Sequence, residues 1–228
     1  KHLIWKPEAP HEAGILQKAE TNIIISEIPA SEAFYDSLVL PSAAKVDNTL
    51  DIEILRRHAQ IQVALYFIGH QLNFRTWIAQ NDKGILYQNK RIGEYEGVIA
   101  SLSDEKLISS HDEAIKAALL IDCIWFKNGR LMPAVMEIEH STGVTSGLSR
   151  MLNFKQHFPP FPTRYVIVAP DEARDKVIRE ASKPQFKDLD AKLFTYSAVE
   201  ELYALCQKRK IRGVTEEFLD CYMEPILN

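Results

Sequence analysis

Residues 120–143 read LIDCIWFKNGRLMPAVMEIEHSTG and carry the strongest structural signal in the chain. Two apolar runs, rich in residues that favour strands, flank the pair Asn128-Gly129. Asn-Gly between two such runs is the strongest short-range sign of a β-hairpin. The stretch therefore predicts two paired strands.

Three acids interrupt this otherwise apolar hairpin, and they are predicted to share one face. If Asn-Gly forms a two-residue loop, Asp122 lies opposite Val135. Paired residues share a face and side chains alternate with period two, so Glu137 and Glu139 project from the same side. Carboxylates held this close repel one another and lose hydration, which a bound divalent cation offsets. Since hard cations such as Mg²⁺ take oxygen ligands, the pattern predicts a metal-binding active site.

Each acid also has a purely structural explanation. Asp122 could be a strand-edge acid that faces solvent, and Glu137 and Glu139 could form the polar face of an edge strand, with Met136 and Ile138 inward. Asp122 is, however, isolated among apolar neighbours, where an unpaired buried charge is costly. The presence of all three acids on one face favours the metal site.

The composition predicts one globular domain, with a small appendage at most. The chain has 228 residues, of which 46% are hydrophobic, enough for a sizeable core. Its three cysteines show neither zinc-site spacing nor a disulfide framework, which suits a reducing cytosol. No apolar run approaches the ~20 residues that span a bilayer, and no signal peptide is recognised. The net charge of −4 argues mildly against a large nucleic-acid surface, although bound cations would cancel part of it.

The remaining patterns predict alternating helices and strands. Residues 1–49 are expected to form an N-terminal arm or small subdomain, and residues 50–228 the main domain. Residues 85–111 are compatible with either a loop or a short helix. Residues 112–119 are compatible with either a brief helix or the approach to the hairpin. Ser197 is the predicted N-cap of a helix, with Glu200 completing a capping box. The patterns predict helices over 49–72, 142–158, 171–182, 197–207 and 214–228, and further strands over 74–79, 164–169 and 192–196.

The hairpin and this order of elements resemble the PD-(D/E)xK nuclease superfamily, which includes most restriction endonucleases. In that family an acid near the end of one strand is followed by Glu/Asp-x-Lys on the next. Asp122 matches the first acid, and Glu137-Ile138-Glu139 matches the second half-motif. Glu139 stands where the family usually has lysine, and a glutamate at this position is similar to the variant found in BamHI. Two consequences remain as alternatives, an altered metal requirement or a degenerate site. The resemblance covers roughly residues 50–205 and implies an α/β fold with a restriction-endonuclease-like core, a central mixed β-sheet flanked by helices.

The resemblance also implies a function, that of a metal-dependent DNA endonuclease. The expected enzyme is a type II-like restriction endonuclease or its catalytic domain, with Mg²⁺ as cofactor and Mn²⁺ as a substitute. Asp122 and Glu137 would hold the ion with the Ile138 carbonyl, while Glu139 would orient or deprotonate water, or hold a second ion. Gln62 is a secondary catalytic candidate, because the matching helix of such nucleases often lends a polar group to the site. A satisfied core residue is the alternative for Gln62 and the favoured interpretation of His58, one helical turn earlier. Asn81 and Asp82 are expected to form only a turn.

The segment after the second half-motif is expected to meet DNA. Ser141, Thr142 and Ser146 suit a helix N-terminus, where hydroxyl and N–H groups can also grip a phosphate. Arg150 lies on the same predicted helix and is expected at the DNA backbone. The expected partners are double-stranded DNA and a second copy of the chain, in the cytoplasm of a bacterial or archaeal cell. An inactive DNA-binding module of the same fold, and a transposition or repair nuclease, remain as alternatives.

Overall fold

The computed structural model describes residues 15–18, 21–24, 50–140, 143–209, 211 and 215–226. The chain divides into two compact units, Lys1–Val39 and Leu40–Asn228. In the first unit, strands β1 (Ile15–Lys18) and β2 (Thr21–Ile24) form an antiparallel hairpin. The predicted domain boundary after residue 49 stays a prediction.

The second unit is built on a six-stranded mixed sheet with the order β10-β9-β8-β7-β6-β3. Strands β3, β6 and β7 pair antiparallel, β7, β8 and β9 pair parallel, and β10 is antiparallel to β9. The strands are β3 (Arg75–Ile78), β6 (Cys123–Lys127), β7 (Leu131–Ile138), β8 (Arg164–Ala169), β9 (Lys192–Thr195) and β10 (Glu224–Pro225).

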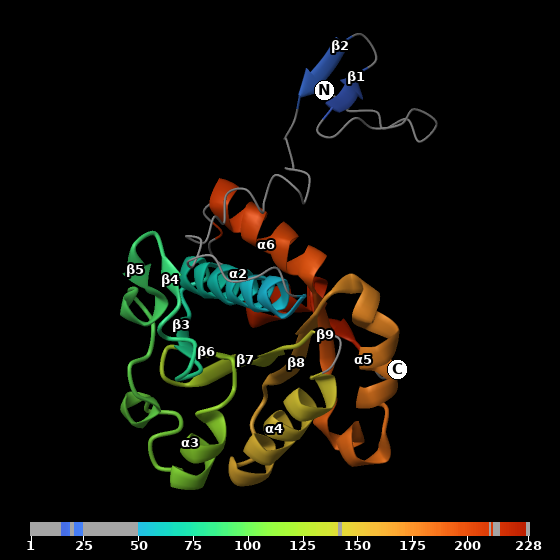
Figure 1. The fold of residues 1–228 in the computed structure, drawn as a ribbon. Helices are drawn as coiled ribbons and strands as arrows, with labels where there is room; N and C mark the ends of the chain where they lie inside the picture. The colour runs from blue at the N-terminus through green and yellow to red at the C-terminus, as the bar shows by residue number, and fades with distance from the viewer. Residues whose placement is uncertain are drawn as a thin grey trace. The chain divides into compact units, whose positions relative to one another are not determined.

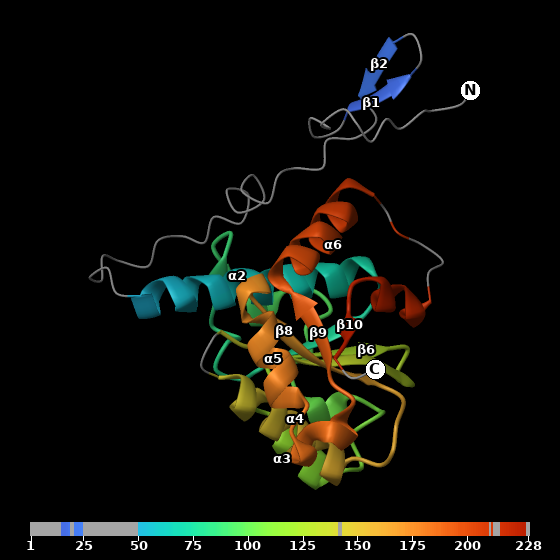
Figure 2. The same cartoon turned by 90° about the vertical axis from the view of Figure 1, so that its right-hand side faces the viewer.

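Helices cover both faces of this sheet, which confirms the predicted fold class (Figure 1). Helices α2 and α6 lie together on one face, and α3, α4 and α5 lie on the other, as the turned view in Figure 2 also shows. The helices are α2 (Leu50–Gln71), α3 (Asp112–Ala118), α4 (Val144–His157), α5 (Arg174–Ala181) and α6 (Tyr196–Lys208).

The central strands are buried because helices cover the sheet on both sides. In β7, every residue after Leu131 is buried, and in β8 every residue after Arg164 is buried. Strands enclosed in this way read as nearly continuous apolar runs, which explains why the acid of β7 stood out in the sequence. Glu137 therefore sits on a rigid element at the centre of the sheet.

The hairpin forms at the predicted turn. Asn128 and Gly129 have φ angles of 55° and 62°, and the Arg130 N–H donates to the Lys127 carbonyl over 3.1 Å. Positive φ at both central residues is the signature of the type I′ turn that Asn-Gly favours.

The predicted register of this hairpin is wrong by two residues. The pairing is irregular between Trp125 and Lys127, and Cys123 pairs with Met136 rather than with Ala134. A shift of two residues moves the strands past each other but keeps every side chain on its face, since side chains alternate with period two. The predicted shared face of the acids therefore survives the error.

Between β3 and β6 the chain forms short elements rather than an α-helix before α3. Strands β4 (Leu86–Tyr87) and β5 (Lys90–Arg91) make a small hairpin, followed by the 3₁₀ turns η1 (Ile92–Glu94) and η2 (Leu102–Asp104).

Helices α5 and α6 begin differently from the sequence-based expectation. A 3₁₀ turn, η3 (Asp171–Ala173), precedes α5. Helix α6 is capped by Thr195, whose hydroxyl accepts from the Ala198 N–H over 3.3 Å, so the predicted Ser197 cap is wrong. The predicted capping box fails for the same reason, and the Glu200 carboxylate instead binds the Arg57 guanidinium at 2.5 Å.

The end of the chain is not the predicted helix over 214–228. It contains a 3₁₀ turn, η5 (Glu216–Cys221), and then β10. Pro225 cannot continue a helix, and it is tolerated in an edge strand such as β10. A free edge of β9 thus decides the structure here, which a local pattern cannot reveal. Another 3₁₀ segment, η4 (Pro184–Leu189), joins α5 to β9.

Candidate active site

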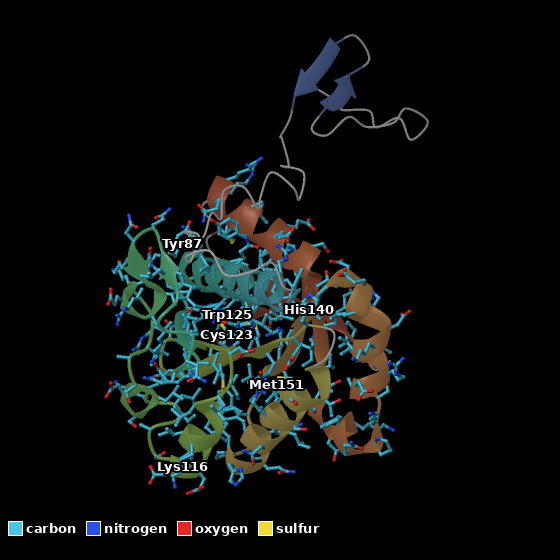
Figure 3. The ribbon with its side chains drawn as sticks, viewed as in Figure 1. Tyr87, Lys116, Cys123, Trp125, His140 and Met151 are labelled. Carbon is cyan, nitrogen blue, oxygen red and sulfur yellow. The ribbon has the colours of Figure 1, made fainter. Side chains whose placement is uncertain are left out.

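The three acids of the hairpin lie at one end of the sheet. Asp122 immediately precedes β6, Glu137 lies near the end of β7, and Glu139 follows β7. Cys123 and His140, which follow Asp122 and Glu139 in the chain, mark these two strand ends in Figure 3. The acids are buried, with exposed fractions of 9% for Asp122, 0% for Glu137 and 7% for Glu139. The solvent-facing explanation of these residues is therefore wrong.

A guanidinium group from α4 compensates part of this buried charge. The Arg150 Nε lies 3.0 Å from Glu137 Oε1, and its Nη2 lies 2.6 Å from Glu137 Oε2. The same Nη2 lies 3.0 Å from Glu139 Oε1. Paired hydrogen bonds between ionised groups are stronger than neutral ones and fix orientation. Glu137 and Glu139 thus face the same cation, on one side of β7. The predicted contact of Arg150 with DNA stays a prediction.

Hydrogen bonds hold Asp122 in place from two directions. Its Oδ2 accepts from the Ile138 backbone N–H over 2.7 Å, which links the start of β6 to the end of β7. Its backbone carbonyl accepts from Gln62 Nε2 over 2.9 Å and from the Ala79 N–H over 3.2 Å. Gln62 is fully buried, and its Oε1 has no hydrogen-bond partner among the described residues. This secondary catalytic candidate therefore lies directly against Asp122.

Burial raises the pKa of all three carboxyl groups. It raises the pKa of Glu139 to about 7 and that of Glu137 well above its ordinary value, although Arg150 lowers both. The pKa of Asp122 is also raised by burial, against the opposing effect of His58 and the Ile138 N–H. Protons are therefore retained here near neutral pH, and a cation that entered would displace them.

Two glycines at the start of α4 make room for Glu139. A Cβ atom on Gly143 would lie 1.7 Å from Glu139 Oε2. A Cβ atom on Gly147 would lie 2.7 Å from Glu139 Oε1 and 3.0 Å from Glu137 Cβ. The sequence pattern of this segment indicated only a helix cap or phosphate grip. The four-residue spacing of the two glycines was the available signal for a close approach.

The predicted DNA contacts of the same segment are only partly described. Ser141 and Thr142 lie outside the described residues, and Ser146 is exposed in the first turn of α4. Their contact with a phosphate stays a prediction.

The structure adds two side chains for which the sequence indicated other roles. His58 was interpreted as a core residue and Asp82 as part of a turn, yet His58 Nε2 lies 3.3 Å from Asp82 Oδ2. With Asp122 they offer three ligand atoms that all lie within 4.8 Å of one another. No other set of three His, Cys, Asp or Glu side chains in the described part of the chain meets this condition. The three acids of the hairpin, taken together, do not meet it either.

The electrostatics of His58 reflect the neighbouring acids. Burial lowers its pKa, but the hydrogen bond to Asp82 and the charge of Asp122 outweigh this effect, and the pKa of His58 is raised overall. The position of His58, one helical turn before Gln62 on α2, was the signal for its place at the site.

Comparisons with known proteins show the family to which the chain belongs. The model of the family described as the type II restriction enzyme NmeDI C-terminal domain matches residues 39–226. The chain belongs to this family. All the acids described above, and His58, lie within the matched region. The chain is 58% identical over 227 residues to the type II restriction enzyme NmeDI of Neisseria meningitidis serogroup C.

That alignment covers 98% of the chain and 64% of the relative, so the chain spans less than two thirds of the length of NmeDI. No solved structure matches the chain significantly. In the part of the chain that the structure describes, no helix combines the length and apolar character needed to cross a membrane.

Proposed function

We propose that this member of the family is the catalytic part of a type II restriction endonuclease and hydrolyses phosphodiester bonds of double-stranded DNA with a divalent metal ion. The observation that carries the proposal is the burial of Asp122, Glu137 and Glu139 at one end of the sheet. A relative at 58% identity that is named a type II restriction enzyme supports the class of substrate. Because the chain spans only part of that relative, the activity of the whole enzyme is part of the proposal.

The donor set at this end of the sheet fits a hard divalent cation. One guanidinium binds two of the three buried carboxyl groups, Glu137 and Glu139, so the negative charge of the three is only partly compensated. Backbone N–H and C=O groups of a strand residue face the same neighbouring strand, so the Ile138 carbonyl is expected on the Asp122 side. We expect Asp122, Glu137 and this carbonyl to hold Mg²⁺, with Mn²⁺ as a substitute. Such an ion, when bound, polarises the scissile phosphate and stabilises its developing charge.

Glu139 is the proposed acceptor of the proton that the attacking water loses. With a pKa of about 7, its carboxylate is a stronger base at neutral pH than an ordinary glutamate and is still ionised in part. Gly143 and Gly147 enclose it, and Arg150 Nη2 fixes one of its oxygens. An orientation fixed before the substrate arrives lowers the barrier to proton transfer.

Arg150 is the proposed link between the acids and the DNA backbone. Its side chain is 34% exposed while it binds Glu137 and Glu139, so it borders both the acids and solvent. We propose that the Arg150 guanidinium would contact a phosphate of the DNA backbone when Glu137 holds an ion, and that Ser141, Thr142 and Ser146 would also contact the backbone. Two-fold symmetric cleavage of both strands implies a homodimer, and restriction of incoming DNA implies the cytoplasm.

One observation favours a second candidate function, that of an inactive DNA-binding module. Arg150 binds two of the three acids, and a fixed internal cation is one way in which a degenerate site is stabilised. Glu139, in the position where lysine is usual, supports the same candidate. This module would bind DNA without cutting it.

A plasmid assay separates the two candidates. The protein is incubated with a panel of supercoiled plasmids, methylated and unmethylated, in Mg²⁺ or Mn²⁺, with EDTA as the control. We expect discrete fragments in either metal and none in EDTA. Calcium should support binding with little cleavage, because it accepts a looser geometry. Tight binding without cleavage across both metals and all methylation states would support the inactive module instead.

A further inference from the structure

His58, Asp82 and Asp122 form a compact group of metal-ligand atoms on the α2 side of the acids. They come from three separate parts of the chain: α2, the turn after β3, and the residue before β6. The His58 Nε2 and Asp82 Oδ2 atoms are 3.3 Å apart, and all three ligand atoms fall within 4.8 Å of one another. Ligand atoms about 2.1 Å from one ion are roughly 3 to 4 Å apart. Small side-chain rotations would therefore bring all three onto a single cation.

The group is also accessible and incompletely satisfied. The side chains of His58 and Asp82 are 26% and 24% exposed, so an ion can enter from solvent, while Asp122 lies deeper. Gln62, one helical turn along α2 from His58, lies against Asp122 with its Oε1 buried and unpartnered among the described residues. An unpaired buried oxygen costs free energy, and a cation or its water would satisfy it.

We propose that His58, Asp82 and Asp122 bind a divalent transition-metal ion, with Gln62 Oε1 bound to the ion or to its water. One imidazole nitrogen with two carboxylates suits Mn²⁺, Co²⁺ or Zn²⁺, whereas Mg²⁺ takes oxygen ligands almost alone. The inference goes beyond the proposed function, because an ion can bind here without any DNA cleavage. It would share Asp122 with the ion expected at Glu137.

Manganese binding to the protein alone tests the site. Free Mn²⁺ is followed by electron paramagnetic resonance during titration of the wild type and of the His58→Gln, Asp82→Asn and Glu137→Gln variants. Asp104→Asn is the matched control, because Asp104 is an exposed aspartate in η2. Thermal unfolding without metal checks that each variant folds.

We expect His58→Gln and Asp82→Asn each to lower the affinity for one bound Mn²⁺ ion at least about ten-fold. Even the loss of a residue that only supports a metal ligand usually has an effect of this size. Glu137→Gln and Asp104→Asn should leave this ion in place. Wild-type Mn²⁺ binding in both His58→Gln and Asp82→Asn would overturn the proposal. The proposal would also be overturned if Glu137→Gln lost all Mn²⁺ binding while Asp82→Asn bound Mn²⁺ as the wild type does. That result would leave the proposed nuclease site intact.

A second measurement uses the wild-type protein alone, so its result does not depend on whether a variant folds. Electron spin-echo modulation of Mn²⁺ bound to the wild-type protein should show coupling to an imidazole nitrogen. An ion held by oxygen atoms alone would show none, and this result would contradict the assignment of His58.

Discussion

Arg150 on α4 binds Glu137 on β7 through two nitrogen atoms, with Nε 3.0 Å from Oε1 and Nη2 2.6 Å from Oε2. This pair joins the first helix after the hairpin to the central strand of the sheet. Because Glu137 is fully buried, the guanidinium supplies positive charge at the position where the proposed function requires a metal ion. Arg150 and the ion should therefore substitute for each other electrostatically, and this relationship can be measured.

Replacement of Arg150 by alanine should destabilise the protein most when no divalent ion is present. The variant leaves Glu137 and Glu139 without their counter-charge, and breaking a buried pair costs about 3–5 kcal/mol. Since Arg150 is one-third exposed and the acids can retain protons, we expect about 2 kcal/mol at pH 8. Urea unfolding in EDTA and in Mn²⁺ checks this, with exposed Arg179→Ala as the control. Equal losses with and without Mn²⁺ would show that the ion does not replace the guanidinium.

Glu139 should make the protein less stable as the pH rises, in the presence of EDTA. Its pKa is about 7 in the folded protein against an ordinary value of 4.5, so the folded state binds more protons than the unfolded state between these limits. The free energy of unfolding therefore falls between pH 4.5 and 7, by at most about 3 kcal/mol from this group. Glu139→Gln should remove that part of the slope. A wild-type slope in Glu139→Gln would mean that Glu139 ionises normally.

Gly147→Ala should disturb the site through steric overlap alone. The new Cβ would lie 2.7 Å from Glu139 Oε1 and 3.0 Å from Glu137 Cβ, so one of the acids must move. Overpacking of this kind typically costs about 1–3 kcal/mol, and a displaced carboxylate should lower cleavage at least about ten-fold. Gly84→Ala is the matched control, because no described atom lies within 4 Å of the Cβ that this substitution adds. Equal stability and cleavage of the two variants would place Glu139 elsewhere.

The chemistry of Glu139 is tested by two substitutions. Glu139→Gln keeps the shape and hydrogen bonding of the side chain but removes the base. It should lower the cleavage rate about 10²–10⁴-fold. Glu139→Lys introduces the residue that is usual at this position in the nucleases the hairpin resembles. It should retain some activity, below that of the wild type, because the lysine charge disfavours cation binding. Single-turnover cleavage at saturating metal separates chemistry from binding. A wild-type rate for Glu139→Gln would make Glu139 a bystander.

Local patterns predicted the hairpin and its face correctly. Asn128-Gly129 selects the turn. Because side chains alternate with period two, a register shift of two residues leaves Glu137 and Glu139 on the predicted side of the strand. The shift itself was not predictable, because it follows from an irregularity between Trp125 and Lys127 that leaves no simple mark in the sequence.

Residues that reach the site from other elements could not be predicted in the same way. Arg150, His58 and Asp82 come to the acids only after α4, α2 and the turn after β3 have packed on the sheet. Arg150 was therefore expected at DNA, and Asp82 only in a turn. Strand β10 was missed because its partner, β9, lies outside the local pattern.

The most direct test of the proposed nuclease site is single-turnover cleavage of plasmid DNA by Glu137→Gln. The substitution preserves the size of the side chain but removes the charge that the metal requires. Glu201→Gln, on the exposed surface of α6, is the matched control. At saturating Mg²⁺ or Mn²⁺, we expect the wild type and Glu201→Gln to produce the same discrete fragments, and Glu137→Gln to bind the DNA without cutting it. Cleavage by folded Glu137→Gln at the wild-type rate would contradict the assignment of these acids as the active site.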